Sequence, residues 1–194
     1  MKRKNKVKSE GQLNKDATPT YSAIRKMRAR ISNAKDVKSF LFRLLILVAF
    51  LVLIFHGLFG LYAVSNEEMV PRVSPGDLLL FFRYNDSYLA DDVVIYQVSG
   101  ENHVGRVVAK SGDSVDIADG GGLYINGNYE VEKDIYFDTY AFEDFQDYPV
   151  TLDEGEYFIL ADNRENAKDS RYYGAISKEQ IVGKVISLMR RGKL

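Results

Sequence analysis

The longest apolar run of the chain lies near its start. No side chain between Arg43 and Glu67 is charged, and Leu44 to Val64 are 21 consecutive, mostly apolar residues. A helix rises about 1.5 Å per residue, so this run spans roughly 31 Å, the thickness of a bilayer core. The run is longer than the apolar core of a cleavable signal peptide, and 43 residues precede it. We therefore predict one retained N-terminal transmembrane helix.

After this run the pattern changes to alternating apolar and polar positions or to short apolar runs, which is typical of β strands. We predict strands at Leu78–Arg83, Val93–Val98, Val104–Ala109, Ser114–Ile117, Leu123–Ile125, Glu156–Leu160 and Val185–Met189. The pair Asn126-Gly127 favours a tight hairpin, because a type I′ turn needs positive φ at both central residues. A short helix is expected at Lys178–Ile181. The predicted fold class is mostly β, behind one transmembrane helix.

Charge is divided unevenly along the chain. Residues 1–43 carry 13 Lys and Arg against 3 Asp and Glu, whereas residues 44–194 carry 13 against 24. Basic flanks stay in the cytoplasm, so we expect a single-pass protein of the cell membrane with its N-terminus inside. The predicted parts are a basic cytoplasmic tail at 1–39, an anchor at 40–64 and an extracellular β domain at 65–194. The acidic balance of that domain argues against a nucleic-acid partner.

The basic tail allows two interpretations. Residues 1–20 are polar, rich in Lys and without a period, which predicts disorder. Residues 21–39 fit either a basic helix lying on anionic membrane lipid or a solvated tail that only sets the topology. The chain has no Cys, which excludes a disulfide scaffold, a thiol nucleophile and a Cys-based zinc site. We expect no cofactor and no metal.

One segment of the β region has an unusual composition. Residues 134–148 read DIYFDTYAFEDFQDY, with six aromatic side chains interleaved with five carboxylates. This composition fits an acidic surface that binds a partner through aromatic anchors. We favour the simpler interpretation, in which two edge strands pack these aromatic side chains inward.

Three short motifs carry a family resemblance. They are Glu68-Met69-Val70-Pro71 followed by Gly76-Asp77, then Arg106-Val107-Val108 followed by Gly112-Asp113, and last Asp162-Asn163-Arg164 through Asp169-Ser170-Arg171, closed by Gly174. In this order behind one anchor they resemble the type I signal peptidases, membrane-anchored serine proteases that remove signal peptides outside the cell membrane. The resemblance covers about residues 40–190. It implies the β fold shared by signal peptidase and LexA.

The resemblance also marks two substituted positions. In that family a Ser hydroxyl attacks the peptide carbonyl, and a neutral Lys amine removes its proton. The Ser position corresponds to Glu68, which has no hydroxyl, and the Lys position to Gly105, which has no group to take a proton. In the third motif, Ala161 replaces a Gly and Ala167 replaces a Ser that hydrogen-bonds the Lys amine. We therefore expect vacant catalytic positions and a protein that is not an enzyme.

The resemblance implies a retained framework and a binding role. Arg106, Asp162, Asp169 and Arg171 occupy positions where the family forms structural ion pairs. The family's groove pairs with an extended peptide by strand addition, which needs backbone groups and no nucleophile. We expect Glu68, Met69 and Pro71 to belong to this groove. Whether Glu68 binds a partner's Lys or an Arg of its own domain stays open.

Relatives with such substitutions occur in Gram-positive bacteria, notably streptococci, beside pilus proteins and sortases. There they are regarded as assembly factors for pilin polymerisation. The resemblance therefore implies a membrane-anchored, non-proteolytic accessory factor that presents pilin subunits to a sortase. Its partners would be pilins, a sortase and the lipid around the anchor. An exposed strand edge can also pair with its own copy, so a homodimer is compatible with this interpretation.

Two alternatives remain. One is an active signal peptidase with a displaced pair drawn from Ser65, Ser74, Lys110 and Lys168. Strand alternation places Lys110 on the face opposite residue 105, and Lys168 is expected to point away from its neighbour Ala167, so we do not favour this pair. An aspartic-protease pair of Glu68 with Asp162 or Asp169 is weaker still. The other alternative is a membrane regulator unrelated to pilins.

Overall fold

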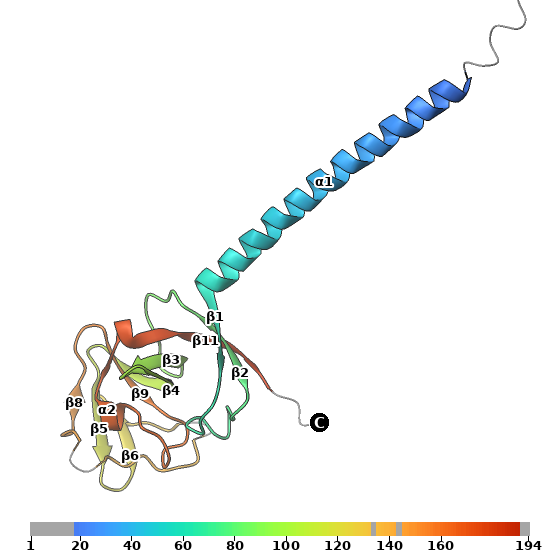
Figure 1. Cartoon of the computed structure of the whole chain (residues 1–194). Helices are drawn as coiled ribbons and strands as arrows, with labels where there is room; N and C mark the ends of the chain where they lie inside the picture. Colours follow the sequence, from blue (N-terminus) through green and yellow to red (C-terminus); the bar gives the residue numbers. More distant parts are fainter. Residues whose placement is uncertain (1–17, 133–134, 143–144, 191–194) are drawn as a thin grey trace, which may run out of the picture. The chain divides into compact units, whose positions relative to one another are not determined.

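A computed structural model describes residues 18–132, 135–142 and 145–190 of the chain (Figure 1). The chain divides into two compact units, Met1–Leu53 and Ile54–Leu194. Helix α1, Thr18–Leu58, begins in the first unit, so residues 18–20 are helical and not part of a disordered tail. Residues 1–17 of the predicted tail lie outside the described residues.

Among the described residues, one helix is long and apolar enough to cross a membrane. The candidate span is Lys35–Leu58, with 24 residues. A signal sequence near the N-terminus can also contain a helix this long and apolar, so the finding concerns the helix alone. The helix confirms the predicted N-terminal apolar element and fits a membrane anchor.

The predicted helix is wrong at its C-terminal end. It ends at Leu58 instead of Val64, and the next five residues form strand β1, Phe59–Ala63, antiparallel to β2, Leu78–Phe82. Glycine disfavours a helix, and Gly60 is needed in the strand: a Cβ there would lie 2.2 Å from Cζ of the Phe81 ring. The N–H of Arg83, directly after β2, donates to the Leu58 carbonyl over 2.9 Å, which satisfies one of the carbonyls that the ending helix leaves free.

The β unit consists of two sheets (Figure 1). The larger sheet has the order β1-β2-β11-β3-β4-β9-β10. Its further strands are β3 Val93–Val98, β4 Glu101–Lys110, β9 Glu156–Leu160, β10 Ile176–Ser177 and β11 Ile181–Met189. The smaller sheet has the order β7-β6-β5-β8, with β5 Ser114–Ala118, β6 Gly122–Ile125, β7 Asn128–Tyr129 and β8 Val150–Thr151. The fold class is therefore mostly β, as predicted.

Each predicted strand coincides with an observed one, because the alternation of apolar and polar residues matches burial on one sheet face. The hairpin between β6 and β7 turns at Asn126, with φ 53°, and Gly127, with φ 78°, as a type I′ turn requires. The predicted short helix is the 3₁₀ helix η1, Lys178–Gln180. A second short helix, α2, covers Ser170–Tyr173.

The segment 134–148 does not form the pair of edge strands that we favoured. None of its described residues is in a strand, and β8 begins only at Val150. Its backbone is held at Thr139, whose N–H donates to the carbonyl of Gly121 over 2.9 Å in a turn of the smaller sheet. Its aromatic rings contact α2 and its flanks instead of a neighbouring strand: Phe145 lies 4.3 Å from Tyr172 between ring centroids.

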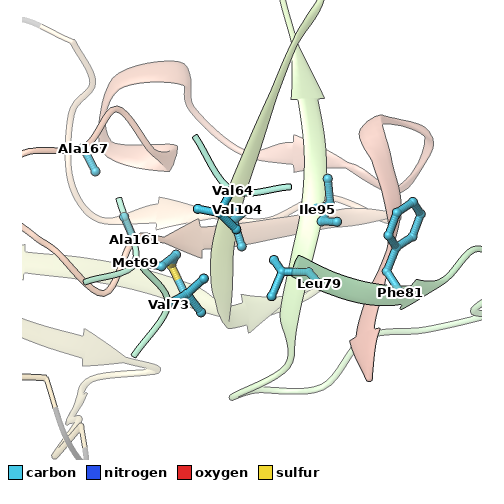
Figure 2. Packing of buried hydrophobic residues seen from close by; sticks show 9 residues of the cluster. All are labelled: Val64, Met69, Val73, Leu79, Phe81, Ile95, Val104, Ala161 and Ala167. Carbon is cyan, nitrogen blue, oxygen red and sulfur yellow. The ribbon is translucent and has the colours of Figure 1, made fainter. Parts of the chain in front are cut away.

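Part of the core joins the first and third motifs. Figure 2 shows the cluster of Val64, Met69, Val73, Leu79, Phe81, Ile95, Val104, Ala161 and Ala167. Met69 of the first motif packs here with Ala161 and Ala167 of the third, and its sulfur accepts a weak hydrogen bond from Asp162 N over 3.4 Å. Burial of these side chains therefore fixes the loop after β1 against the end of β9.

Candidate active site

The second and third motifs are joined by a buried ion pair. Arg106 on β4 contacts the Asp162 carboxylate twice, from Nη2 over 2.7 Å and from Nε over 2.9 Å. Burial by itself lowers the pKa of Arg106, but the hydrogen bond and charge of Asp162 outweigh it and raise the pKa. Nη1 of Arg106 also donates to the Asp91 carbonyl over 3.0 Å. The pair that the resemblance implied is therefore formed and fully hydrogen-bonded.

The second implied pair stabilises the third motif itself. Asp169 caps α2 and accepts hydrogen bonds from Nε and Nη2 of Arg171, each over 2.9 Å. It also accepts from the backbone N–H groups of Arg171 and Ala161. Arg171 reaches onward to the carbonyls of Tyr140 and Arg164. Both charges are buried, and each has several partners.

Sequence reasoning missed a third buried cation in this framework. Arg164 forms an ion pair with Glu132 and hydrogen-bonds the Thr139 hydroxyl. These contacts link the segment after β7 and the segment 134–148 to the third motif. The chain positions 132, 139 and 164 are far apart, so no local pattern indicates the contact.

Glu68 lies against β4, where it binds His103. Its Oε1 lies 2.9 Å from Nδ1 of His103, and its backbone carbonyl accepts from Asn163 N over 2.9 Å. Glu68 is 9% exposed and His103 is 7% exposed. Among the described residues, the Glu68 carboxylate therefore has a histidine of its own domain as its partner, rather than an Arg. The alternation of β4, which places residues 103 and 105 on one face, is the signal that points to His103.

Aromatic rings surround this pair. The His103 ring stacks on Tyr96, with centroids 5.5 Å apart, and lies 5.4 Å from Tyr173. Burial raises the pKa of Tyr96 well above its ordinary value, and the negative charges of Asp169 and Glu68 raise it further. The Tyr96 phenol therefore stays neutral beside the pair.

Gly105 lies on β4 beside this pair, and its space is filled. A Cβ at this position would lie 2.5 Å from Cγ2 of Ile159 and 3.2 Å from Cε1 of Tyr96. The first distance is shorter than any that real Cβ atoms tolerate, so a longer side chain at this position needs its neighbours to move. Packing in the core therefore accounts for the glycine.

The pair lies in a cleft of about 1000 Å³. Residues that line it include Ser65, Glu68, His103, Ala167 and Lys168, with the aromatic residues Tyr62, Phe142, Phe145, Tyr172 and Tyr173. Of the three predicted groove residues, Glu68 lines the cleft. Met69 is 1% exposed in the core, and Pro71, although exposed, does not line this cleft.

Lys168 and Ala167 both line the cleft, although Ala167 is buried in the core cluster and Lys168 is exposed. That the Lys168 side chain points away from Ala167 stays a prediction. The prediction assumed strand alternation, but residues 165–168 do not form a strand. The Lys168 ammonium lies 4.7 Å from the centroid of the Tyr172 ring. Ser65 shares this cleft, whereas Ser74 and Lys110 do not line it.

Comparison with known proteins identifies the family. The model of the family described as "Signal peptidase, peptidase S26" matches residues 37–189. The chain belongs to the signal peptidase S26 family. Signal peptidase IB of Staphylococcus aureus strain N315 is 31% identical over 160 residues, which is 72% of this chain and 83% of that protein. Signal peptidase I of Bacillus amyloliquefaciens is 32% identical over 153 residues, 72% of this chain and 80% of that protein.

A solved structure of this family was also matched. The crystal structure of a signal peptidase I from Enterococcus faecalis V583 shows 26% identity and a TM-score of 0.44, covering 54% of this chain and 100% of that one.

The comparisons overturn the expectation that the chain is not an enzyme. Its matched relatives are named signal peptidases, which are enzymes, and its family is a peptidase family. The expectation rested on Glu68 and Gly105, with Ala161 and Ala167 as further support, and substitutions at motif positions do not show that activity is lost. A serine and a lysine, Ser65 and Lys168, line the same cleft. The correspondence of Glu68 and Gly105 to the Ser and Lys positions stays a prediction.

Proposed function

We propose that this S26 family protein handles exported polypeptides at the outer face of the cell membrane. The basic residues before the apolar helix favour an N-terminus in the cytoplasm and a β unit outside. The observation that carries the proposal is the cleft with the Glu68–His103 pair. Its aromatic rings and buried polar atoms are the features of a site that binds and orients a chain segment.

The more specific form of the proposal is that the exported polypeptides are pilin subunits, which the protein presents to a sortase. It is supported by the resemblance to streptococcal pilus assembly factors that carry an acidic residue and a glycine at the positions of Glu68 and Gly105. Oε1 of Glu68 contacts His103, and Oε2 is buried without a hydrogen-bond partner among the described residues. The cleft has a volume of about 1000 Å³.

A gene deletion tests the pilin proposal. Pilus polymers extracted from the cell wall should be lost in the deletion strain and restored by the wild-type gene. The Glu68→Gln variant should restore them poorly, whereas the matched Glu130→Gln variant, which alters an exposed glutamate outside the cleft, should restore them fully. Polymers of normal length in the deletion strain would contradict the proposal.

A second candidate function is signal-peptide cleavage by a displaced pair. The observation that favours it is that Ser65 and Lys168 line one cleft. The detergent-solubilised full chain should then cleave a signal-peptide substrate, and Ser65→Ala or Lys168→Ala should abolish cleavage. Ser74→Ala is the control, because Ser74 does not line the cleft. Cleavage that persists in Ser65→Ala would exclude this pair.

A further inference from the structure

The Glu68–His103 pair leaves two polar atoms without a protein partner. Glu68 Oε2 and His103 Nε2 are buried and have no hydrogen-bond partner among the described residues. Both residues are at least nine-tenths buried, and both line the cleft. A buried polar atom without a partner is costly, so such atoms at a cleft indicate a ligand that pairs with them.

The chemistry of the two atoms restricts this ligand. A carboxylate oxygen accepts hydrogen bonds and donates none. In the neutral imidazole, the proton on Nδ1 donates to Oε1 of Glu68, which leaves Nε2 as an acceptor. A group that satisfies both atoms must supply at least two donors. A primary ammonium carries three donors and no acceptor, so it meets this requirement.

The charge of the cleft favours a cation. Glu68, Glu101 and Glu165 line it, against the single ammonium of Lys168. The carboxylates outnumber the lysine, and carboxylates collected in a cleft raise the local concentration of cations. An uncharged side chain of similar shape, such as norleucine or acetyl-lysine, is not attracted by these carboxylates.

The walls of the cleft favour the same cation. Phe142, Phe145, Tyr172 and Tyr173 line it, and the negative face of an aromatic ring attracts ammonium groups. The site already shows this contact, because Lys168 Nζ lies over the Tyr172 ring. The aliphatic stem of a lysine packs on such rings while its head reaches the acceptors.

We propose that the cleft binds a primary ammonium group of an exported polypeptide, with Glu68 Oε2 and His103 Nε2 as its acceptors. The ammonium is either a lysine side chain or the free amino end of the polypeptide. The inference rests on the proposed function, since it names the group that the site recognises in its exported partner.

The test uses the full chain in detergent micelles and fluorescent octapeptides that differ at one position. With acetylated amino ends, the central residue is lysine, norleucine, acetyl-lysine or trimethyl-lysine. Trimethyl-lysine keeps the charge but has no N–H donor. A fifth peptide carries norleucine and a free amino end, which distinguishes the two sources of the ammonium. Binding is measured by fluorescence anisotropy.

Two of the peptides carry a primary ammonium: the blocked lysine peptide and the norleucine peptide with a free amino end. At least one of these two ammonium peptides should bind ten-fold or more tighter than the blocked norleucine, acetyl-lysine and trimethyl-lysine peptides. In Glu68→Gln and in His103→Phe, that preference should fall below two-fold, whereas Glu130→Gln should keep it. The preference is a ratio within one variant, so it does not depend on the folded fraction. Equal binding of all five peptides would overturn the ammonium site while leaving polypeptide binding intact. Binding of the trimethyl-lysine peptide as tight as that of the tighter ammonium peptide, or a preference that survives Glu68→Gln, would also overturn it.

Discussion

Removing the carboxylate of Asp169 tests the buried framework most sharply. The Asp169→Ala substitution deletes the acceptor of four hydrogen bonds: two from the Arg171 guanidinium, one from Arg171 N and one from Ala161 N. The Arg171 side chain stays where it is, because Nη1 and Nη2 also donate to the carbonyls of Tyr140 and Arg164. The substitution therefore leaves a guanidinium buried without its counter-charge.

The expected cost follows from this burial. Asp169 is 0% exposed and Arg171 is 1% exposed, so water does not replace the lost partner. Breaking a buried pair by removing one member costs about 3–5 kcal/mol of unfolding free energy. For a β unit of this size, each kcal/mol lowers Tm by roughly 3 °C, which predicts a decrease of about 10 °C or more. Replacing both partners, as in Asp169→Ala with Arg171→Leu, should recover part of the loss, since no charge is then left unpaired.

Thermal unfolding of the full chain in detergent, followed by circular dichroism in the β region, measures these shifts. Asp119→Ala is the matched control, because Asp119 is an exposed aspartate in the turn after β5. It should change the unfolding free energy by less than about 0.5 kcal/mol. A Tm of Asp169→Ala within 2 °C of the control would correspond to a loss of roughly 0.5 kcal/mol of unfolding free energy or less. That result would refute the reasoning.

Two further predictions concern packing and pH. Gly183→Ala on β11 should destabilise the fold by about 1–3 kcal/mol, because its Cβ would lie 2.3 Å from the Phe82 carbonyl oxygen, and urea denaturation measures the loss. The raised pKa of Tyr96 stabilises the folded state below the ordinary value of about 10, and this contribution is lost as pH rises through the raised pKa. In Tyr96→Phe the decrease of Tm above pH 10 should therefore be smaller than in the exposed-site control Tyr136→Phe, and equal slopes would contradict the assignment.

Local patterns predicted the strands and missed the end of the helix. β3 and β9 are short, mostly apolar runs that are visible in a few consecutive residues, and both were placed with the observed bounds. The residues around Phe59 are mostly apolar, which suits a helix and a strand alike. Composition alone therefore does not show where the helix ends and the strand begins. That boundary depends on pairing with β2, about twenty residues further along the chain.

Only the contacts between residues of the three motifs were predictable from the sequence. The ion pairs of Arg106 and Arg171 are formed as the resemblance implied, because these residues occupy the family's ion-pairing positions. The contact of Glu68 with His103 joins residues 35 positions apart and belongs to no motif, so sequence reasoning missed it. Strand alternation gave no basis for placing Lys168 in the cleft, because residues 165–168 do not form a strand.

Photo-crosslinking in living cells tests the central claim most directly. A photoreactive amino acid replaces Phe145, which lines the cleft and is 50% exposed, or Leu89, which is 58% exposed and does not line it. The account predicts covalent adducts with pilin subunits from position 145 and none from position 89. Pilin adducts of equal yield from both positions, or none from position 145 in cells that are assembling pili, would contradict it.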